Sequence, residues 1–307
     1  MTSSQAPVSV VIPIYNAAHS VETQVWAVIA QMGEGDELVL VDNRSTDSTL
    51  QVVRRLCALS SQIRVVEARA AQGVAHARNV GLKAAQHDLL LICDADDRIR
   101  PGWVEAMRTA LGSCDLAGGL LVKVSELPST THASDVPEVS PRNDSVLGLG
   151  RIFGHWAYPV GANMACHRRV LQCIGGFDES FVGGHEEVDF AWRAQDAGFT
   201  VQEVTDAVVD YVERAIPRAQ ARRYRQYART SIQLWCRHRC KVEEYAVSFR
   251  GAVCALAQAL PLGVLLAVGR GDLASAQRWG WAVGLVEGHV RYRYLGQLPP
   301  PHIPKYM

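Results

Sequence analysis

The first hundred residues alternate short apolar runs with segments of helical periodicity, and no other feature limits the fold as strongly. Runs rich in Val, Ile and Leu are typical of strands that are buried on both faces of a parallel sheet. Strands joined by helices form βαβ units with right-handed crossovers, which place helices on both faces. We therefore expect an α/β fold with a mostly parallel sheet. Its first strands should lie in residues 8–16, 36–43, 63–68 and 88–97.

Polar residues gather where these predicted strands end. The first strand closes on residues 13–16, the second runs into residues 42–45, and the fourth runs into residues 94–97. Open α/β sheets bind their ligands at the carboxyl ends of the strands. A binding site is therefore expected at this edge.

Two carboxylates with one residue between them follow the apolar run 89–93. These residues, Asp94 and Asp96, have the spacing at which two acids can share one hard divalent cation. Mg²⁺ and Mn²⁺ prefer carboxylate and phosphate oxygens. The acids could instead belong to the turn that Pro101 and Gly102 predict. Because the other strand ends are also polar, we favour a site for Mg²⁺ or Mn²⁺ that holds a diphosphate.

Composition and cysteine usage limit the classes of function. The chain has 31 Lys and Arg against 31 Asp and Glu and no block of like charge, so we expect no nucleic-acid partner. Its cysteines are scattered through apolar stretches, which is typical of reduced thiols in a cytoplasmic protein. Residues 236–240, CRHRC, favour a helix face over a metal site. The N-terminus lacks a charged segment before an apolar core, so we predict no signal peptide.

The C-terminal part of the chain is predicted to be helical from residue 216 onward. Residues 251–268 carry no charge, which meets the minimum for a spanning helix. Their Gln258, Pro261 and small residues favour a buried or membrane-surface helix instead. With the Arg-rich stretch 214–241 and the Trp- and Arg-containing stretch 277–295, this region suits peripheral contact with the inner face of a membrane. A helical subdomain packed on the core, or a homodimer contact, remains an equal alternative.

Six stretches of the chain form one series: VSVVIPIYN, VLVDNRSTDST, GVAHARNVGL, LLICDADD, GGFDESF and HEEVDFAWRAQDAGF. Together they resemble the inverting family 2 glycosyltransferases of GT-A fold. They follow the family's order from residue 8 to about residue 214, and the rest of the chain matches more loosely. The resemblance implies a GT-A domain in residues 1–215, divided near residue 100 into a nucleotide-binding part and an acceptor and catalytic part. Residues 216–307 would form the C-terminal helical region.

The resemblance also implies roles for nucleotide-binding residues. Pro13 and Tyr15 would meet the base and ribose, and Asp42 would receive the base N–H. Arg78 would be the arginine on the nucleotide side, and Asp94 the acid on the ribose side.

The remaining implied roles concern the metal, the sugar and the general base. Asp96 would bind the metal, and Asp210 would be a further metal ligand where the family frequently has His. Glu186 would lie near the sugar hydroxyls. Glu187 falls where the family normally has its Asp base, so we expect Glu187 to take the acceptor proton. Glu186 and Asp189 are the rival bases, and Asp189 should point elsewhere on its helix.

The function that follows is inverting, metal-dependent transfer of a sugar from a nucleoside-diphosphate sugar to an acceptor hydroxyl. We expect a UDP-sugar as donor and a glycan, a lipid-linked glycan or a small molecule as acceptor. The alternatives are a non-catalytic module that binds nucleotide sugars, and a nucleotidyltransferase. The acids at 186–189 argue against pure binding, and the stretch after the first strand, PIYNAAHS, lacks the Gly-rich basic loop of a nucleotidyltransferase.

Overall fold

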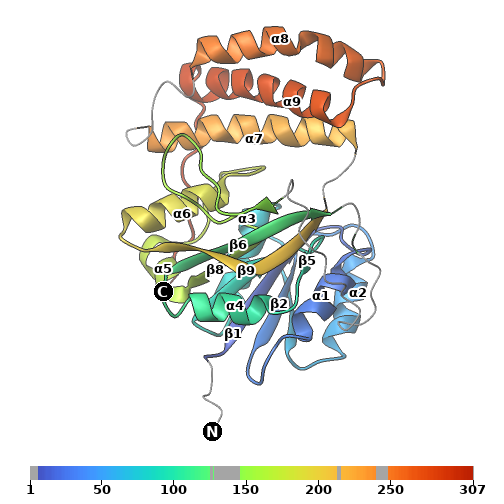
Figure 1. The fold of residues 1–307 in the computed structure, drawn as a ribbon, viewed down its shortest axis with the longest axis vertical. Helices are drawn as coiled ribbons and strands as arrows, with labels where there is room; N and C mark the ends of the chain where they lie inside the picture. The colour runs from blue at the N-terminus through green and yellow to red at the C-terminus, as the bar shows by residue number, and fades with distance from the viewer. Residues whose placement is uncertain (1–5, 125–126, 128–145, 213–215, 240–247, 307) are drawn as a thin grey trace.

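The structure is a computed structural model that describes residues 6–124, 127, 146–212, 216–239 and 248–306. A twisted sheet with helices on both faces forms the larger part, and the helices α7, α8 and α9 stack beyond one edge of the sheet (Figure 1). The expected α/β fold with a C-terminal helical region is confirmed. Most of the predicted loop 125–150 lies outside the described residues.

The N-terminal half contains the four predicted strands in parallel pairing, in the order β3-β2-β1-β4. Its elements are β1 (Val8–Ile14), α1 (Val21–Ile29), β2 (Glu37–Asp42), α2 (Thr49–Cys57), β3 (Ile63–Glu67), α3 (Val74–Ala84) and β4 (Leu89–Cys93).

The second half of the sheet is mixed, because β8 lies antiparallel between β4 and β6. The predicted strand or strands after residue 200 are one long strand, β9, parallel to β6. The strand β6 was not anticipated from the sequence. The elements are β5 (Arg98–Ile99), α4 (Trp103–Ala110), β6 (Leu116–Val124), β7 (Val146–Leu147), β8 (Asn163–His167), α5 (Arg168–Ile174), α6 (Glu186–Asp196) and β9 (Val201–Val212).

Two apolar cores cover the two faces of this sheet. Successive strand residues point to opposite faces, so Val10 and Ile12 of β1 pack with α1, α2 and α4, whereas Val11 packs with α3, α5 and α6. Both faces of the sheet are therefore covered by apolar side chains and shielded from water. That leaves the strand ends as the polar part of the sheet, as the sequence predicts.

The three C-terminal helices stack on one another above the core. They are α7 (Pro217–His238), α8 (Phe249–Ala267) and α9 (Leu273–Gly288), followed by the π-helical turn η3 (His289–Tyr294). Residues Gly280 and Gly284 allow α9 to approach α7 closely, because a Cβ at either position would overlap the carbonyl oxygen of Ala221 or Arg225. Among the described residues, α8 is the one helix long and apolar enough to cross a membrane, and only 17% of its apolar window is buried.

The chain does not end in the helical layer, because its last residues return to the core. The amide of Gly176 donates to the Pro304 carbonyl at 2.9 Å, and the amide of Glu179 donates to the His302 carbonyl at 2.9 Å. The Tyr306 hydroxyl donates to the carbonyl of Asn79 on α3 at 2.9 Å. The C-terminus therefore lies beside α5, at the left side of the sheet in Figure 1.

Candidate functional site

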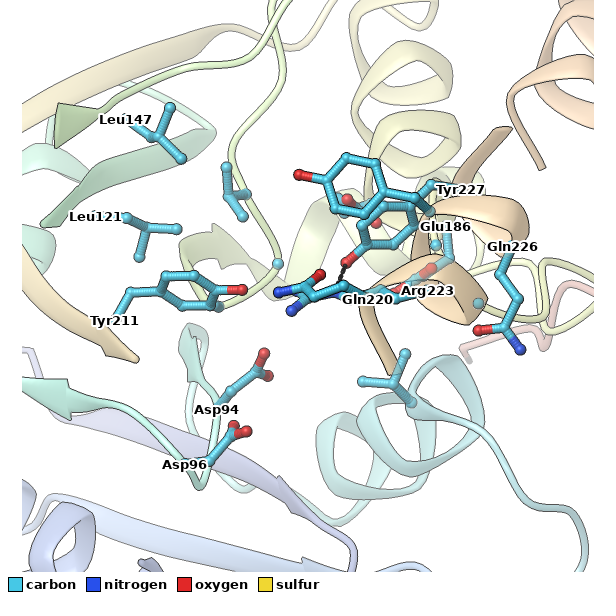
Figure 2. A pocket seen from close by; sticks show the side chains of 18 of the residues that line it. Asp94, Asp96, Leu121, Leu147, Glu186, Tyr211, Gln220, Arg223, Gln226 and Tyr227 are labelled. Atoms are coloured by element: carbon cyan, nitrogen blue, oxygen red, sulfur yellow. Dashed lines mark hydrogen bonds between the residues drawn. The ribbon is translucent and has the colours of Figure 1, made fainter. Parts of the chain in front are cut away.

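A pocket of about 620 Å³ lies where β4 ends and where α6 and α7 begin. Asp94 and Asp96 enter it from the end of β4, and Glu186 and Glu187 enter it from the first turn of α6. Figure 2 shows the two aspartates on one side of the pocket and the α7 side chains on the other. The strand edge that the sequence singles out is therefore one wall of this pocket.

Arg78 joins the two acidic groups. Its Nη2 donates to Asp94 Oδ1 at 3.0 Å, and its Nη1 donates to Glu186 Oε1 at 2.8 Å. The guanidinium is buried, with 3% of its side chain exposed. Burial alone would lower the pKa of Arg78, but the carboxylates of Asp94 and Glu186 raise it, so this cation is permanent. The arginine therefore fixes the first acid of D-x-D relative to α6.

The acids of α6 have different surroundings. Glu186 is buried against Arg78, whereas Glu187 is partly exposed and lines the pocket. Asp189 faces away from the pocket, where it accepts from Arg193 Nε at 2.7 Å and lies 3.0 Å from His238 Nε2. Of the three acids, Glu187 is therefore the one that faces the pocket without an arginine holding it.

The proton affinity of Glu187 is unusual for a carboxyl group. Burial, followed by repulsion from Glu186, raises the pKa of Glu187 to about 8. Burial also raises the pKa of Glu186, although Arg78 opposes this change. A carboxylate with such a pKa accepts a proton far more readily than an ordinary glutamate.

The carboxylates of D-x-D fit a cation that is held together with a ligand. In the described part of the chain, no cluster of three or more His, Cys, Asp and Glu side chains could hold a metal by itself. Mg²⁺ is commonly bound through one or two protein carboxylates, with waters and substrate phosphates completing its shell. Asp96, with Asp94 beside it, fits that donor set.

Asp210 is placed differently from the sequence expectation. It pairs with Arg98 on β5, and its two oxygens lie 2.9 Å from Arg98 Nη2 and 2.7 Å from Arg100 Nη2. It does not line the pocket, whereas the next residue, Tyr211, does. Tyr211 and Val212, at the end of β9, reach the pocket, whereas both carboxylate oxygens of Asp210 lie against arginines.

The three residues expected around the base lie at the adjacent strand ends, outside the lining of this pocket. Pro13 is buried in β1, and Tyr15, just after β1, is 51% exposed. Asp42 is 4% exposed, and the amide of Ser45 donates to its Oδ2 at 3.4 Å. Its Oδ1 is buried and has no hydrogen-bond partner among the described residues. A buried acceptor without a partner fits a donor N–H supplied by a ligand.

Residues of α7 complete the pocket, and the sequence analysis did not identify them. Arg223 Nε donates to the Tyr227 hydroxyl at 2.7 Å, and the guanidinium lies 5.8 Å from the Tyr211 ring centre. Gln220 and Tyr224 line the same pocket. The spacing of 220, 223, 224 and 227 places these side chains on one helix face, and this periodicity was a signal that could have found them. The Arg-rich stretch therefore contributes to the site.

Comparison with known sequences identifies the family. The model of "Glycosyl transferase family 2" matches residues 9–175, which is more than half of the chain. Glycosyltransferase AglE of Haloferax volcanii is 25% identical over 247 residues, which cover 76% of each chain. The pre-mycofactocin glycosyltransferase of Mycobacterium tuberculosis is 26% identical over 283 residues, which cover 87% of this chain and 54% of that protein.

Solved structures show the same fold. One is the mannosyltransferase PcManGT of Pyrobaculum calidifontis in complex with GDP-Man and Mn²⁺, with a TM-score of 0.61 and 21% sequence identity. The superposition covers 95% of this chain and 88% of the PcManGT chain. Residues 1–349 of S. aureus TarS, in complex with UDP-GlcNAc, give a TM-score of 0.52 at 16% identity. This superposition covers 94% of this chain and 93% of the TarS chain. The GT-A fold is thereby confirmed. Together with the match over residues 9–175, these findings show that the chain belongs to glycosyl transferase family 2 and is a glycosyltransferase.

Proposed function

We propose that this glycosyltransferase is inverting and metal-dependent, and that it moves a sugar from a nucleoside-diphosphate sugar to an acceptor hydroxyl. The donor proposed is a UDP-sugar. The observation that carries the proposal is a single pocket that brings together the D-x-D carboxylates after β4 and Glu187 at the start of α6. A base on another element than the leaving-group site suits inversion, in which the base acts on the face of the sugar opposite to the leaving group.

Donor binding is assigned to the strand ends. Pro13 and Tyr15 would contact the base and ribose, and Asp42 would accept the base N–H through its unpartnered Oδ1. Asp94, held by Arg78, would bind the ribose side. The PcManGT structure is in complex with GDP-Man and the TarS structure with UDP-GlcNAc, which supports a nucleotide-sugar donor.

Asp96 would hold a Mg²⁺ or Mn²⁺ ion together with the donor diphosphate, and the PcManGT complex with Mn²⁺ supports this choice. When bound, the ion neutralises the negative charge that develops on the leaving diphosphate. Arg223 lines the same pocket and supplies a protein cation for that charge. Asp210 is left out of this assignment, because both of its oxygens lie against arginines.

Glu187 would take the proton from the acceptor hydroxyl as that oxygen attacks the sugar. Its pKa of about 8 favours proton acceptance near neutral pH. Glu186 is paired with Arg78 and is better placed to bind a sugar hydroxyl. Asp189, bound to Arg193 and His238, keeps α6 in place.

The domain division near residues 100 and 215 is part of the same proposal, as is a cytoplasmic location with peripheral contact at the inner face of a membrane. The acceptor would be a glycan, a lipid-linked glycan or a small molecule. The exposed apolar face of α8 supports the membrane contact, and a homodimer contact through this face is the alternative.

Release of nucleoside diphosphate tests the proposal. The protein would be incubated with Mn²⁺ and a panel of UDP- and GDP-sugars, first without and then with glycoside acceptors. Glu187→Gln should keep donor binding in a thermal-shift assay yet lose most of kcat, and Glu105→Gln, on the exposed side of α4, is the matched control. NMR of the product would show the inverted anomeric configuration. Donor binding without any release would favour the non-catalytic module.

A further inference from the structure

A second cavity, of about 330 Å³, lies in the helical layer between α7, α8 and α9. We call it the α8–α9 groove. Ala255, Ala259 and Leu262 line it from α8, Trp281 and Arg278 line it from α9, and Tyr224 closes it from α7. Its volume is within the range of small-molecule sites.

The groove and the reaction pocket share one wall. Tyr224 lines both cavities. Tyr224 stands on the helix that also brings Gln220, Arg223 and Tyr227 to the reaction pocket. Tyr224 therefore lies between the two spaces, and a molecule that passes its ring would contact both.

The two cavities differ in chemistry. The reaction pocket is lined by acids and cations, including Asp96, Glu187 and Arg223. The groove is lined mainly by alanine, leucine and tryptophan side chains together with Gln258, Gln277 and Arg278, and no acid of the described chain lines it. The exposed Leu260 and Val264 lie on the opposite face of α8, with Ala257, and do not line the groove. A polar pocket beside a largely apolar groove suits a ligand with one polar and one apolar end.

We propose that the α8–α9 groove binds the apolar chain of an amphiphilic acceptor whose hydroxyl-bearing end lies in the reaction pocket. This inference rests on the proposed transfer to a hydroxyl and adds the class of acceptor. The groove therefore selects acceptors by the length of their apolar chain.

A homologous series of alkyl glucosides tests the groove. Methyl, butyl and octyl glucoside, each below its critical micelle concentration, would be titrated into the full chain with UDP and Mn²⁺ present, and the heat of binding measured. Each methylene that enters the groove should tighten binding roughly fourfold. The acceptor kcat/KM for the same series, measured by diphosphate release, should follow the same trend.

Two matched variants locate the contact on α8. Ala255→Phe fills the groove, and Ala257→Phe adds the same ring on the exposed side of the helix. We expect Ala255→Phe to abolish the chain-length dependence while methyl glucoside binds unchanged, and Ala257→Phe to change neither. Far-UV circular dichroism and UDP binding would show that both variants fold.

The outcomes separate this inference from the proposed function. Turnover without any chain-length dependence would overturn the groove and leave the transferase intact. Chain-length-dependent binding without turnover would support the groove and count against the proposed transfer. A dependence lost in Ala257→Phe and kept in Ala255→Phe would place the apolar contact on the outer face of α8, as for a membrane or a second copy, and would overturn the proposal.

Discussion

Arg78 links the two acidic parts of the site through its guanidinium group. It contacts Asp94 after β4 and Glu186 at the start of α6, two acids that are 92 positions apart in the chain. Buried charges are tolerated only when they are paired, and removal of one partner leaves the other uncompensated. The pairing therefore contributes to stability and to geometry together.

Arg78→Met should lower the free energy of unfolding by roughly 3–5 kcal/mol, because Glu186 is then left buried without its cation. A second change, Glu186→Gln, should recover part of that loss, since it removes the unpaired charge. Urea unfolding of the two single variants and the double variant gives the coupling energy, which we expect at about 0.5–3 kcal/mol. Strictly additive losses would show that the two side chains are not coupled.

The pH dependence of activity reports on Glu187. The base acts in its deprotonated form, and kcat/KM reflects the pKa of the free enzyme. With a pKa of about 8, kcat/KM should rise about tenfold per unit between pH 6 and 7 and level off above pH 8. A buffer series with saturating Mn²⁺ and a fixed acceptor measures this profile. A flat profile from pH 6 to pH 8 would contradict the assignment.

At the scale of elements, α7 links the catalytic core to the helical layer. One face of this helix lines the reaction pocket, and the carbonyl oxygens of Ala221 and Arg225 lie against Gly280 and Gly284 of α9. Backbones that touch leave no space for a side chain. The position of α7, and with it one wall of the pocket, therefore depends on glycines in another helix.

Gly284→Ala should destabilise the protein, although helix propensity alone favours alanine by up to about 1 kcal/mol. The added methyl group would overlap the Arg225 carbonyl, and such overpacking costs about 1–3 kcal/mol. Thermal unfolding measures the net change, and diphosphate release should fall with it as α7 shifts. A rise in Tm would show that α9 can move away from α7 at no cost.

The C-terminal tail acts on α3 in a similar way. Tyr306 is bound to the carbonyl of Asn79, the residue that follows Arg78. Tyr306→Phe should cost about 0.5–1.5 kcal/mol by removing this bond, and it should weaken donor binding because α3 carries Arg78. Thermal unfolding and UDP titration would be compared with Tyr294→Phe, whose side chain is 59% exposed. Donor affinity that is equal in both variants would limit the tail to a structural role.

In the whole molecule, the pocket lies between two layers, the strand ends of the sheet and the helix α7 (Figures 1 and 2). Arginines expected to meet a membrane have other partners here: Arg223 stacks near Tyr211, and Arg225 and Arg229 pair with Glu287. The apolar face of α8 remains the part of this layer suited to an amphiphilic ligand or surface.

The protonation of Glu187 also affects the stability of the whole chain. Its folded pKa of about 8 lies above its ordinary value of 4.5, so the folded state binds more protons than the unfolded state between these values. The contribution of Glu187 to the free energy of unfolding is therefore largest below about pH 4.5. This contribution is lost as the pH rises to about 8. Glu187→Gln should accordingly have a higher Tm than the unchanged protein at pH 8.5 and a similar Tm at pH 5. Equal Tm differences at both pH values would contradict the raised pKa.

The sequence by itself determined the kinds of element and the place of the site. Periodicity defines which segments are strands and which face is apolar, and parallel connections bring the ends of β1, β2 and β4 to one edge. The positions of Asp42, Asp94 and Asp96 at that edge follow directly. These properties depend on residues that are close together in the chain, so they can be predicted from the sequence.

The tertiary structure alone decided which distant residues meet. Arg78 and Glu186 pair across 108 positions, Tyr306 returns to Asn79 across 227, and Tyr224 divides two cavities formed by three helices. Asp210 shows the limit most clearly: the next two residues line the pocket, yet Asp210 itself is paired with Arg98 and Arg100. Such contacts depend on how elements pack and which face each one presents, and local periodicity carries no information about the partner that packing supplies.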